Sequence, residues 1–386
     1  MFSESINCTD FHGRATAVVL QVDQMGSINY PCHRVSGLRR SLLFLVASLL
    51  HFAVVSGQEQ NAELYLPPLT VPEVPQASEP ILPAPGYWLV SSWRSPQDFS
   101  QGLLRFCPEV TRYDECVGYR NSGMGELTQS LIPGVPVCIV VHGSFMDSES
   151  VHPESRDTLR WLNAGSCGLP VQMIYFSWPS DRSLSALASI DVAILGSRAS
   201  RNGFYLANLI QSVPPECPVC LVGHSHGTRV ISSSLHLLGG GVVEGHRHSN
   251  PGCQGKRIRA VFTAAAIDHD WLNPGERFEN ALCCVECLLN LRNPEDPALM
   301  IYPLRRIGSG RALGCAGFTS QDRRELGFRS VRVKDWDVSD CIGARHLWPN
   351  YSDRPWLASR LRNYLYFADS QHISTLALAP QASVTE

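Results

Sequence analysis

Short apolar runs alternate with helix-like stretches from residue 87 to residue 367, and no other feature of the sequence constrains the fold as strongly. Runs that are apolar at nearly every position are typical of strands buried on both faces, and their alternation with helices indicates a parallel sheet. We therefore predict an α/β fold, a mostly parallel sheet with helices on both faces. The predicted strands are 87–93, 136–143, 170–178, 217–224, 258–268, 283–291 (its first half alternatively helical) and the edge strand 329–338, and the predicted helices are 150–164, 183–212, 226–238 and 353–367.

The carboxyl ends of the strands in such a sheet share one edge, and ligands bind there. Polar residues follow several of the predicted strands: His142, Ser225, Asp268 and the segment 293–296. We therefore expect a functional site to be built from residues at this edge.

Ser225 is the centre of the stretch Gly–His–Ser–His–Gly at 223–227, between a predicted strand and a predicted helix. This is the setting of a nucleophile elbow, a G-x-S-x-G turn that exposes a reactive serine. Glycine is favoured at Gly223 and Gly227 because larger side chains there would collide with the neighbouring strand and helix. The start of the helix also directs backbone N–H groups toward a developing oxyanion. The alternative is a glycine-rich turn with an incidental serine.

A serine nucleophile needs a histidine as its base. His346 lies after the predicted strand 329–338 and before the last predicted helix, so we expect it to be this base. His372 lies in the C-terminal tail, and His246 and His248 lie in a polar segment that we expect to be a surface loop.

Two aspartates could orient this histidine. Asp296 follows the predicted strand 283–291 within Asn–Pro–Glu–Asp–Pro, and Asp268 ends the preceding strand. We favour Asp296 and keep Asp268 as the alternative acid. Asp296 could instead serve only as a turn former or helix cap, because Asp beside Pro is common in turns.

The chain order Ser225, Asp296, His346 is the order found in α/β-hydrolases, and the chain resembles that superfamily over residues 87–368. The resemblance is closest to exported bacterial members with a WPS and a GHSxG motif. It is carried by His346 and by the segments VVHGSF (140–145), FSWPSD (176–181), LVGHSHG (221–227) and NPEDPAL (293–299).

The resemblance implies a serine hydrolase that cleaves an ester-type acyl substrate, either a small molecule or a lipid-like one, through an acyl-enzyme. It also implies an oxyanion hole formed by the backbone N–H of His226 and that of Ser144 or Phe145. An acyltransferase or amidase using the same residues remains open, as does a non-catalytic binding protein of this fold.

Other classes of function find little support in the sequence. The formal net charge of -3 gives no electrostatic reason to expect a nucleic-acid partner. No phosphate-binding loop, zinc-protease motif or dinucleotide fingerprint occurs, so we expect no cofactor and no metal. Trp178 and Trp348 are interpreted either as pocket-lining side chains or as core residues.

The N-terminal part of the chain predicts export. Arg39 and Arg40 precede the apolar run 41–55, and Ser56 and Gly57 follow it, as in a signal peptide. The run is shorter than the roughly 20 residues of a membrane-spanning helix, so an uncleaved anchor is the less favoured reading and the only membrane association expected. We expect a periplasmic or extracellular protein. The predicted organisation is a signal region at 1–57 (with 1–24 a candidate gene-model extension before Met25), a proline-rich linker at 58–86, the hydrolase domain at 87–370 and a tail at 371–386.

The chain has 14 cysteines, some of which should pair in an oxidising compartment. Cys107 and Cys116 are a plausible local bridge. Two C-x-x-C pairs, Cys217 with Cys220 and Cys284 with Cys287, could suggest zinc, but they lie on predicted core strands, which favours buried thiols or a disulfide instead.

Overall fold

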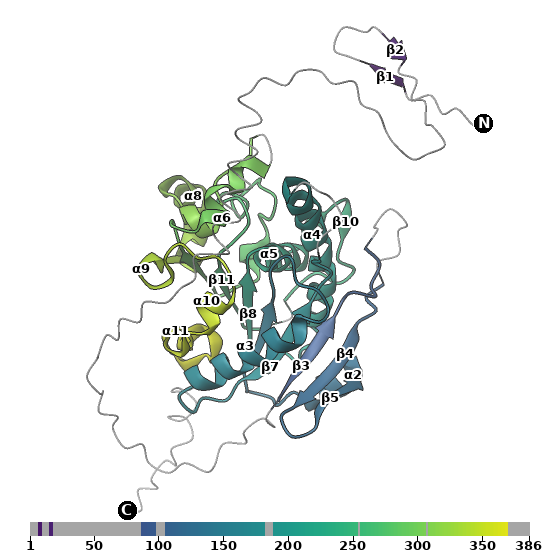
Figure 1. Cartoon of the computed structure of the whole chain (residues 1–386), viewed down its shortest axis with the longest axis vertical. Helices are drawn as coiled ribbons and strands as arrows, with labels where there is room; N and C mark the ends of the chain where they lie inside the picture. The colour runs from purple at the N-terminus through teal and green to yellow at the C-terminus, as the bar shows by residue number, and fades with distance from the viewer. Residues whose placement is uncertain are drawn as a thin grey trace, which may run out of the picture. The chain divides into compact units, whose positions relative to one another are not determined.

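The structure is a computed structural model that describes residues 86–97, 105–181, 188–253, 255–305 and 308–369, together with two short strands near the N-terminus (Figure 1). The chain divides into two units, 1–62 and 63–386. In the first unit, β1 (Asn7–Thr9) pairs antiparallel with β2 (Ala15–Ala17). Apart from these strands and Gly86, the predicted signal region, linker and tail lie outside the described residues.

The main sheet has nine strands among the described residues, in the order β13-β12-β11-β8-β6-β7-β3-β4-β5. The strands from β13 to β3 in this order pair in parallel, and β4 and β5 extend the sheet antiparallel. The strands are β3 (Gly86–Ser91), β4 (Glu109–Asp114), β5 (Gly118–Ser122), β6 (Val137–Val141), β7 (Gln172–Ser177), β8 (Val219–His224), β11 (Ile258–Thr263), β12 (Cys287–Arg292) and β13 (Val333–Asp337), and a separate small pair is formed by β9 (Val242–Val243) and β10 (His246–Arg247).

Helices cover both faces of this sheet (Figure 1). The helices and 3₁₀ helices are α2 (Met124–Ser130), α3 (Val151–Gly165), α4 (Ala188–Ser212), α5 (Gly227–Leu238), η1 (Ala281–Cys283), α6 (Pro297–Met300), η2 (Tyr302–Arg305), α7 (Leu313–Ala316), α8 (Ser320–Leu326), η3 (Gly327–Arg332), α9 (Ser339–Ile342), α10 (Pro349–Ser352), α11 (Pro355–Arg360) and α12 (Arg362–Leu365).

Alternate residues of the central strands contribute to two hydrophobic cores, one on each face of the sheet. On β6, Val137, Ile139 and Val141 belong to the core under α4 and α5, whereas Cys138 and Val140 belong to the core under α3 and α11. Burial on both faces explains why the sequence of this strand is apolar throughout. The predicted fold class is therefore confirmed: the chain has a mostly parallel sheet with helices on both faces, as in the α/β-hydrolase fold.

Most predicted elements are present, and the differences have local causes. The hairpin β4–β5 was not predicted, because its strands are mostly half-exposed and polar and show no clean alternation. The last predicted helix is divided into α11 and α12 at Leu361, where the backbone leaves the helical region. Residues 329–332 form part of the 3₁₀ helix η3 rather than the start of β13.

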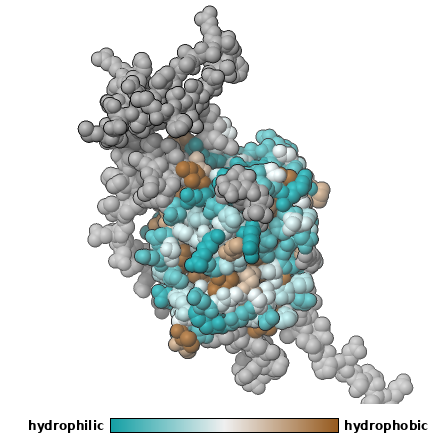
Figure 2. Space-filling view, turned by 90° about the vertical axis from the view of Figure 1, so that its right-hand side faces the viewer, coloured by the Kyte–Doolittle hydropathy of each residue, from teal (hydrophilic) through white to brown (hydrophobic). Residues whose placement is uncertain are grey.

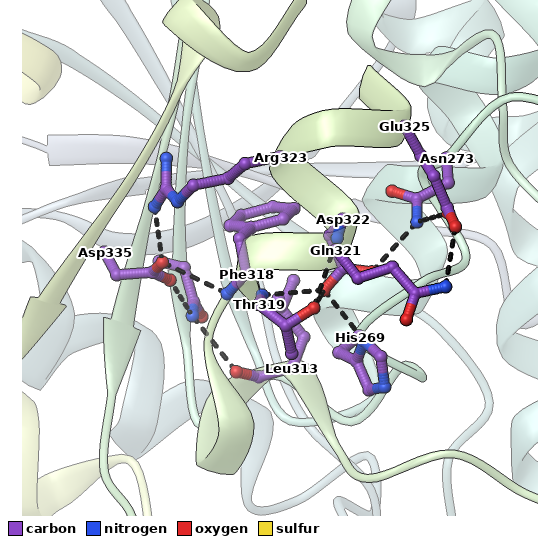
Figure 3. Close-up of polar contacts among 11 residues, drawn as sticks. His269, Asn273, Leu313, Phe318, Thr319, Gln321, Asp322, Arg323, Glu325 and Asp335 are labelled. Atoms are coloured by element: carbon purple, nitrogen blue, oxygen red, sulfur yellow. Dashed lines mark hydrogen bonds and ion pairs between the residues drawn. The ribbon is translucent and has the colours of Figure 1, made fainter. Parts of the chain in front are cut away.

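A polar network connects β12 and β13 to α8 and to the loop that contains His269 (Figure 3). Asp335 on β13 accepts hydrogen bonds from Asn290 of β12 (2.8 Å), from Arg323 of α8 (2.8 Å) and from the Phe318 N–H (3.1 Å). Asp322 completes a capping box at the start of α8 and accepts a hydrogen bond from His269. The pair of His269 and Asp322 therefore connects the loop after β11 to the start of α8.

The cysteine predictions need correction. The predicted Cys107–Cys116 bridge is not formed, and both residues are free. Cys107 precedes β4 and Cys116 follows it, and an extended strand of this length separates its ends by roughly 20 Å, far beyond disulfide reach. Cys253 instead forms a disulfide with Cys284, with the two Cα atoms 5.9 Å apart. Cys284 is thus not available as one of the four thiolates of a zinc site.

The surface of the second unit is mixed in character. Hydrophilic side chains cover most of the face in Figure 2, with small hydrophobic islands between them. Among helices of the described residues, none combines the length and the apolar character needed to cross a bilayer. The apolar run 41–55 lies outside the described part of the chain.

Candidate active site

Ser225 lies on a sharp turn between β8 and α5. Its φ is 50°, a left-handed conformation that is uncommon for serine. The turn is held on both sides, because the Ser225 N–H donates to the Thr263 carbonyl (3.0 Å) and the Thr228 hydroxyl donates to the Ser225 carbonyl (2.6 Å). This strained, firmly bonded turn is the geometry that the G-x-S-x-G pattern predicts.

The two glycines of the motif leave no room for a side chain. A Cβ at Gly223 would lie 2.8 Å from the Ile231 Cδ1 atom and 2.9 Å from the Thr228 nitrogen. A Cβ at Gly227 would collide with the Val141 carbonyl oxygen and lie 2.6 Å from that of His142. The close approach of α5 to β6 therefore depends on Gly227.

We expect Gly227→Ala to destabilise the protein by roughly 1–3 kcal/mol, because the added methyl group meets backbone atoms that cannot rotate away. Gly125→Ala is the matched control: a Cβ at Gly125, in the exposed α2, has no atom within 4 Å, so this change should be neutral or slightly stabilising. Thermal and urea unfolding of both variants checks the prediction. Equal unfolding midpoints for the two variants would show that the elbow tolerates the methyl group.

His346 lies in the loop between α9 and α10, beside Ser225. Its Nε2 atom is 3.1 Å from the Ser225 Oγ atom, and its Nδ1 atom is 2.7 Å from Oδ2 of Asp296. A carboxylate can only accept, so Nδ1 carries the proton and Nε2 is left to accept the hydrogen bond from the Ser225 hydroxyl. The structure thus joins the three residues in one chain of hydrogen bonds.

Asp296 is fully buried and uses both carboxylate oxygens. Oδ1 accepts the N–H groups of Ala298 (3.0 Å) and Leu299 (3.1 Å) at the start of α6, while Oδ2 faces His346. The cap and the histidine contact, two alternative interpretations of this residue from the sequence, are therefore both present. Capping holds the carboxylate rigidly toward the imidazole.

Asp268, the alternative acid, contacts a different group of residues. Its carboxylate pairs with Arg305 and accepts hydrogen bonds from the Tyr302 hydroxyl (3.0 Å) and the Gly310 N–H (3.0 Å). Asp268 is 2% exposed. The carboxylate that faces His346 Nδ1 is that of Asp296.

The backbone around Ser144 and His226 provides a candidate oxyanion hole. Within the described residues, no hydrogen-bond acceptor is recorded for the N–H of either residue. The N–H of Phe145, named above as an alternative donor, instead donates to the Ser180 carbonyl (2.7 Å) and is already engaged. Of these three N–H groups, those of Ser144 and His226 are therefore the ones available to bind an oxyanion.

The His226 side chain links the two halves of this hole. Its Nδ1 atom lies 2.6 Å from the Ser144 Oγ atom. Burial, followed by the charges of Arg229, Arg305 and His346, lowers the pKa of His226 to about 3, so the ring is neutral. The sequence contains no signal for this contact, because the two residues are 82 positions apart.

Two further residues position His346 and were not singled out as such from the sequence. The His224 Nε2–H group donates to the His346 carbonyl (2.7 Å), and the Asn293 amide donates to the Gly343 carbonyl (2.8 Å) in the same loop. Burial lowers the pKa of His224 to about 3, so this ring is neutral and acts as an anchor. In the sequence, their roles are suggested only by their positions: His224 directly precedes Ser225, and Asn293 lies three residues before Asp296.

The remaining candidates are structural. His142 is buried, and Nε2 accepts the Trp178 N–H (3.1 Å) while Nδ1–H donates to the Gly143 carbonyl (2.8 Å). Trp178 and Trp348 are 0% and 3% exposed and belong to the core. His248, expected in a surface loop, is also buried. His372 lies outside the described residues.

Comparisons with models of known protein families and with curated proteins gave no match. Among solved structures, the chain is similar to esterase B from Lactobacillus rhamnosis inhibited by a tributyrin phosphonate, with 11% identity and a TM-score of 0.35 over 87% of this chain and 96% of that one. It is also similar to an acetylxylan esterase, with 14% identity and a TM-score of 0.29 over 62% of this chain and 99% of that one. At such identities and TM-scores, the function has to be inferred from the residues of the site itself.

Proposed function

We propose that this protein is a serine hydrolase that cleaves a carboxylic ester through an acyl-enzyme. The observation that carries the proposal is the unbroken chain from Ser225 Oγ to His346 (3.1 Å) and on to Asp296 (2.7 Å), which starts from a left-handed elbow. A glycine-rich turn with an incidental serine has no need for a histidine and a buried carboxylate aligned in this way.

In the first half of the reaction, the Ser225 Oγ atom attacks the ester carbonyl carbon while His346 Nε2 takes the hydroxyl proton. The oxyanion is held by the N–H groups of Ser144 and His226. When the tetrahedral intermediate collapses, the C–O bond to the alcohol breaks and His346 gives its proton to the departing alkoxide. In the second half, His346 deprotonates a water molecule that attacks the acyl-enzyme, and the proton returns to Ser225 as the acid leaves.

Exposed apolar side chains next to the proposed catalytic elements support an ester with an apolar portion. Phe145 follows the oxyanion donor Ser144, Leu347 follows His346, and Met300 and Leu304 lie shortly after Asp296. They are 48%, 66%, 61% and 66% exposed, respectively. Large exposed apolar side chains that follow the proposed catalytic residues so closely in sequence favour a substrate with an acyl chain or a similar apolar group.

A fluorophosphonate probe tests the proposal directly, because it reacts only with an activated serine. We expect stoichiometric labelling of the wild-type protein and a burst of nitrophenolate from 4-nitrophenyl butyrate as the acyl-enzyme forms. An absence of both labelling and burst in folded protein would contradict the proposal and favour a binding protein.

We also propose that the enzyme acts outside the cytoplasm, on the basis of the signal-like segment 39–57. The disulfide between Cys253 and Cys284 is compatible with an oxidising compartment. Sequencing the amino terminus of the mature protein should give a start near Gln58, whereas full-length protein in the cytoplasm would contradict export.

A further inference from the structure

Among the described residues, three arginines surround the indole of Trp271. The guanidinium carbons of Arg277, Arg229 and Arg305 lie 4.8, 4.9 and 5.4 Å from the ring centre. Cations attracted to one aromatic ring place several positive charges in a small volume. We refer to these four residues as the arginine cluster.

The arginine cluster adjoins the proposed nucleophile. Arg229 lies in the first turn of α5, four residues after Ser225, and its backbone N–H donates to the His226 carbonyl (3.0 Å). The Ala266 N–H donates to the Ser225 carbonyl (3.3 Å), and Asp268, two residues further on, pairs with Arg305. The arginine cluster is therefore built on the same segments that hold the backbone of Ser225 in place.

Arg229 is a buried charge that forms no ion pair with a carboxylate of the described residues. It is 6% exposed, and its Nε–H donates to the Ser200 hydroxyl (2.8 Å). No residue in the described part of the chain accepts a hydrogen bond from its two terminal nitrogens. These two nitrogens remain accessible to solvent. Gly196 gives the guanidinium its space, because a Cβ there would collide with Arg229.

Burial of a charge without a bonded counter-ion is costly, and it disfavours the protonated form of Arg229. Burial, followed by the charges of Arg277 and Arg305, lowers the pKa of Arg229 to about 9. Arg305 has its own carboxylate in Asp268. The charge of Asp268 also favours protonated Arg229, but no carboxylate of the described residues bonds to Arg229 directly. A bound anion would therefore offset part of the cost of burying this charge.

The side chain of His226 is a second, independent feature that favours binding of an anion. His226 is 4% exposed, and while its Nδ1 atom contacts Ser144, its Nε2 atom is buried with no hydrogen-bond partner. Arg229 and Arg305 are the two charged residues with the largest electrostatic effect on this ring. Buried polar atoms nearly always have a partner, so the Nε2–H group of His226 is a donor suited to bind an acceptor such as an anion.

We propose that His226, Arg229 and Arg305 form a subsite for an anionic group, such as a carboxylate, on the ester substrate. This inference rests on the proposed function, since it assigns the charge of the substrate that Ser225 cleaves. Arg229 supplies a positive charge that no carboxylate of the described residues binds directly, and the Nε2–H tautomer of His226 supplies a neutral donor.

The test compares esters matched in shape but not in charge. One pair places the charge on the acyl side (mono-4-nitrophenyl adipate against 4-nitrophenyl hexanoate), and one places it on the alcohol side (4-acetoxybenzoate against its methyl ester). We expect kcat/KM to favour the anion at least tenfold in one pair, as is typical of a charge-assisted hydrogen bond. In Arg229→Met this preference should be lost, and Arg229→Lys should retain part of it.

Arg120→Met is the matched control, because it removes one positive charge from the edge strand β5, where Arg120 pairs with Glu126. It should keep the wild-type preference. Adipate binding to wild type, Arg229→Met and Arg120→Met, measured by calorimetry, gives a readout that needs no turnover: we expect Arg229→Met alone to weaken it at least tenfold. Adipate binding without ester hydrolysis would contradict the proposed function alone. Hydrolysis with no preference for either anion, or a preference unchanged in Arg229→Met, would overturn the subsite.

Discussion

Replacement of Ser225 by alanine should reduce turnover of 4-nitrophenyl butyrate by a factor of roughly 10⁴ or more. The hydroxyl oxygen is the only atom of this side chain that can bond to the acyl carbon, and the hydroxyl donates a hydrogen bond to the Nε2 atom of His346 (3.1 Å). His346→Ala should cause a loss of the same order, because an unassisted serine hydroxyl is a weak nucleophile. Initial rates of nitrophenolate release provide the measurement.

The double variant is the more discriminating measurement. If Ser225 and His346 act as one unit, Ser225→Ala with His346→Ala should be little slower than either single variant. Ser212→Ala, at the end of α4, is the control for serine loss, since within the described part of the chain its hydroxyl donates only to the Leu209 carbonyl (2.7 Å). Wild-type rates in His346→Ala, or full probe labelling of Ser225→Ala, would be incompatible with the proposed mechanism.

The parts of the fold that surround this serine were predictable because they carry strong local signals. β8 is buried at all six positions, so its sequence contains only residues that can be enclosed, and it ends at a motif whose glycines are sterically required. The carboxyl ends of parallel strands meet at one edge. Strand order and motif order together therefore predict that Ser225, Asp296 and His346 lie at the same edge of the sheet.

The features that escaped prediction depend on contacts between distant segments. Cys253 and Cys284 are 31 residues apart, and nothing in their local sequence distinguishes them from Cys107 and Cys116. The contact of His226 with Ser144 arises only when α5 packs against the end of β6. The strands β4 and β5 are held by backbone pairing, with little burial, so they leave a weak pattern in the sequence.

The choice between Asp296 and Asp268 illustrates the same limit, since both follow strands and both are buried. The structure separates them by their partners: Asp296 faces His346, and Asp268 faces Arg305. Asp268→Asn should therefore act mainly on stability, because it leaves Arg305 as a buried charge without its counter-ion, at a cost of roughly 3–5 kcal/mol. Thermal unfolding measures that cost, and probe labelling of the folded fraction should persist.

Asp296→Asn should have the opposite profile, with a loss of kcat by a factor of roughly 10²–10⁴ and a smaller change in stability. The amide oxygen of asparagine can still accept the N–H groups of Ala298 and Leu299, so the cap of α6 is retained. The amide nitrogen then faces His346 Nδ1 and donates to it, which moves the imidazole proton to Nε2. A protonated Nε2 cannot accept the Ser225 proton, and the nucleophile loses its base. If Asp268→Asn instead reduces kcat more than Asp296→Asn at a temperature where both variants are folded, the orienting acid is wrongly assigned.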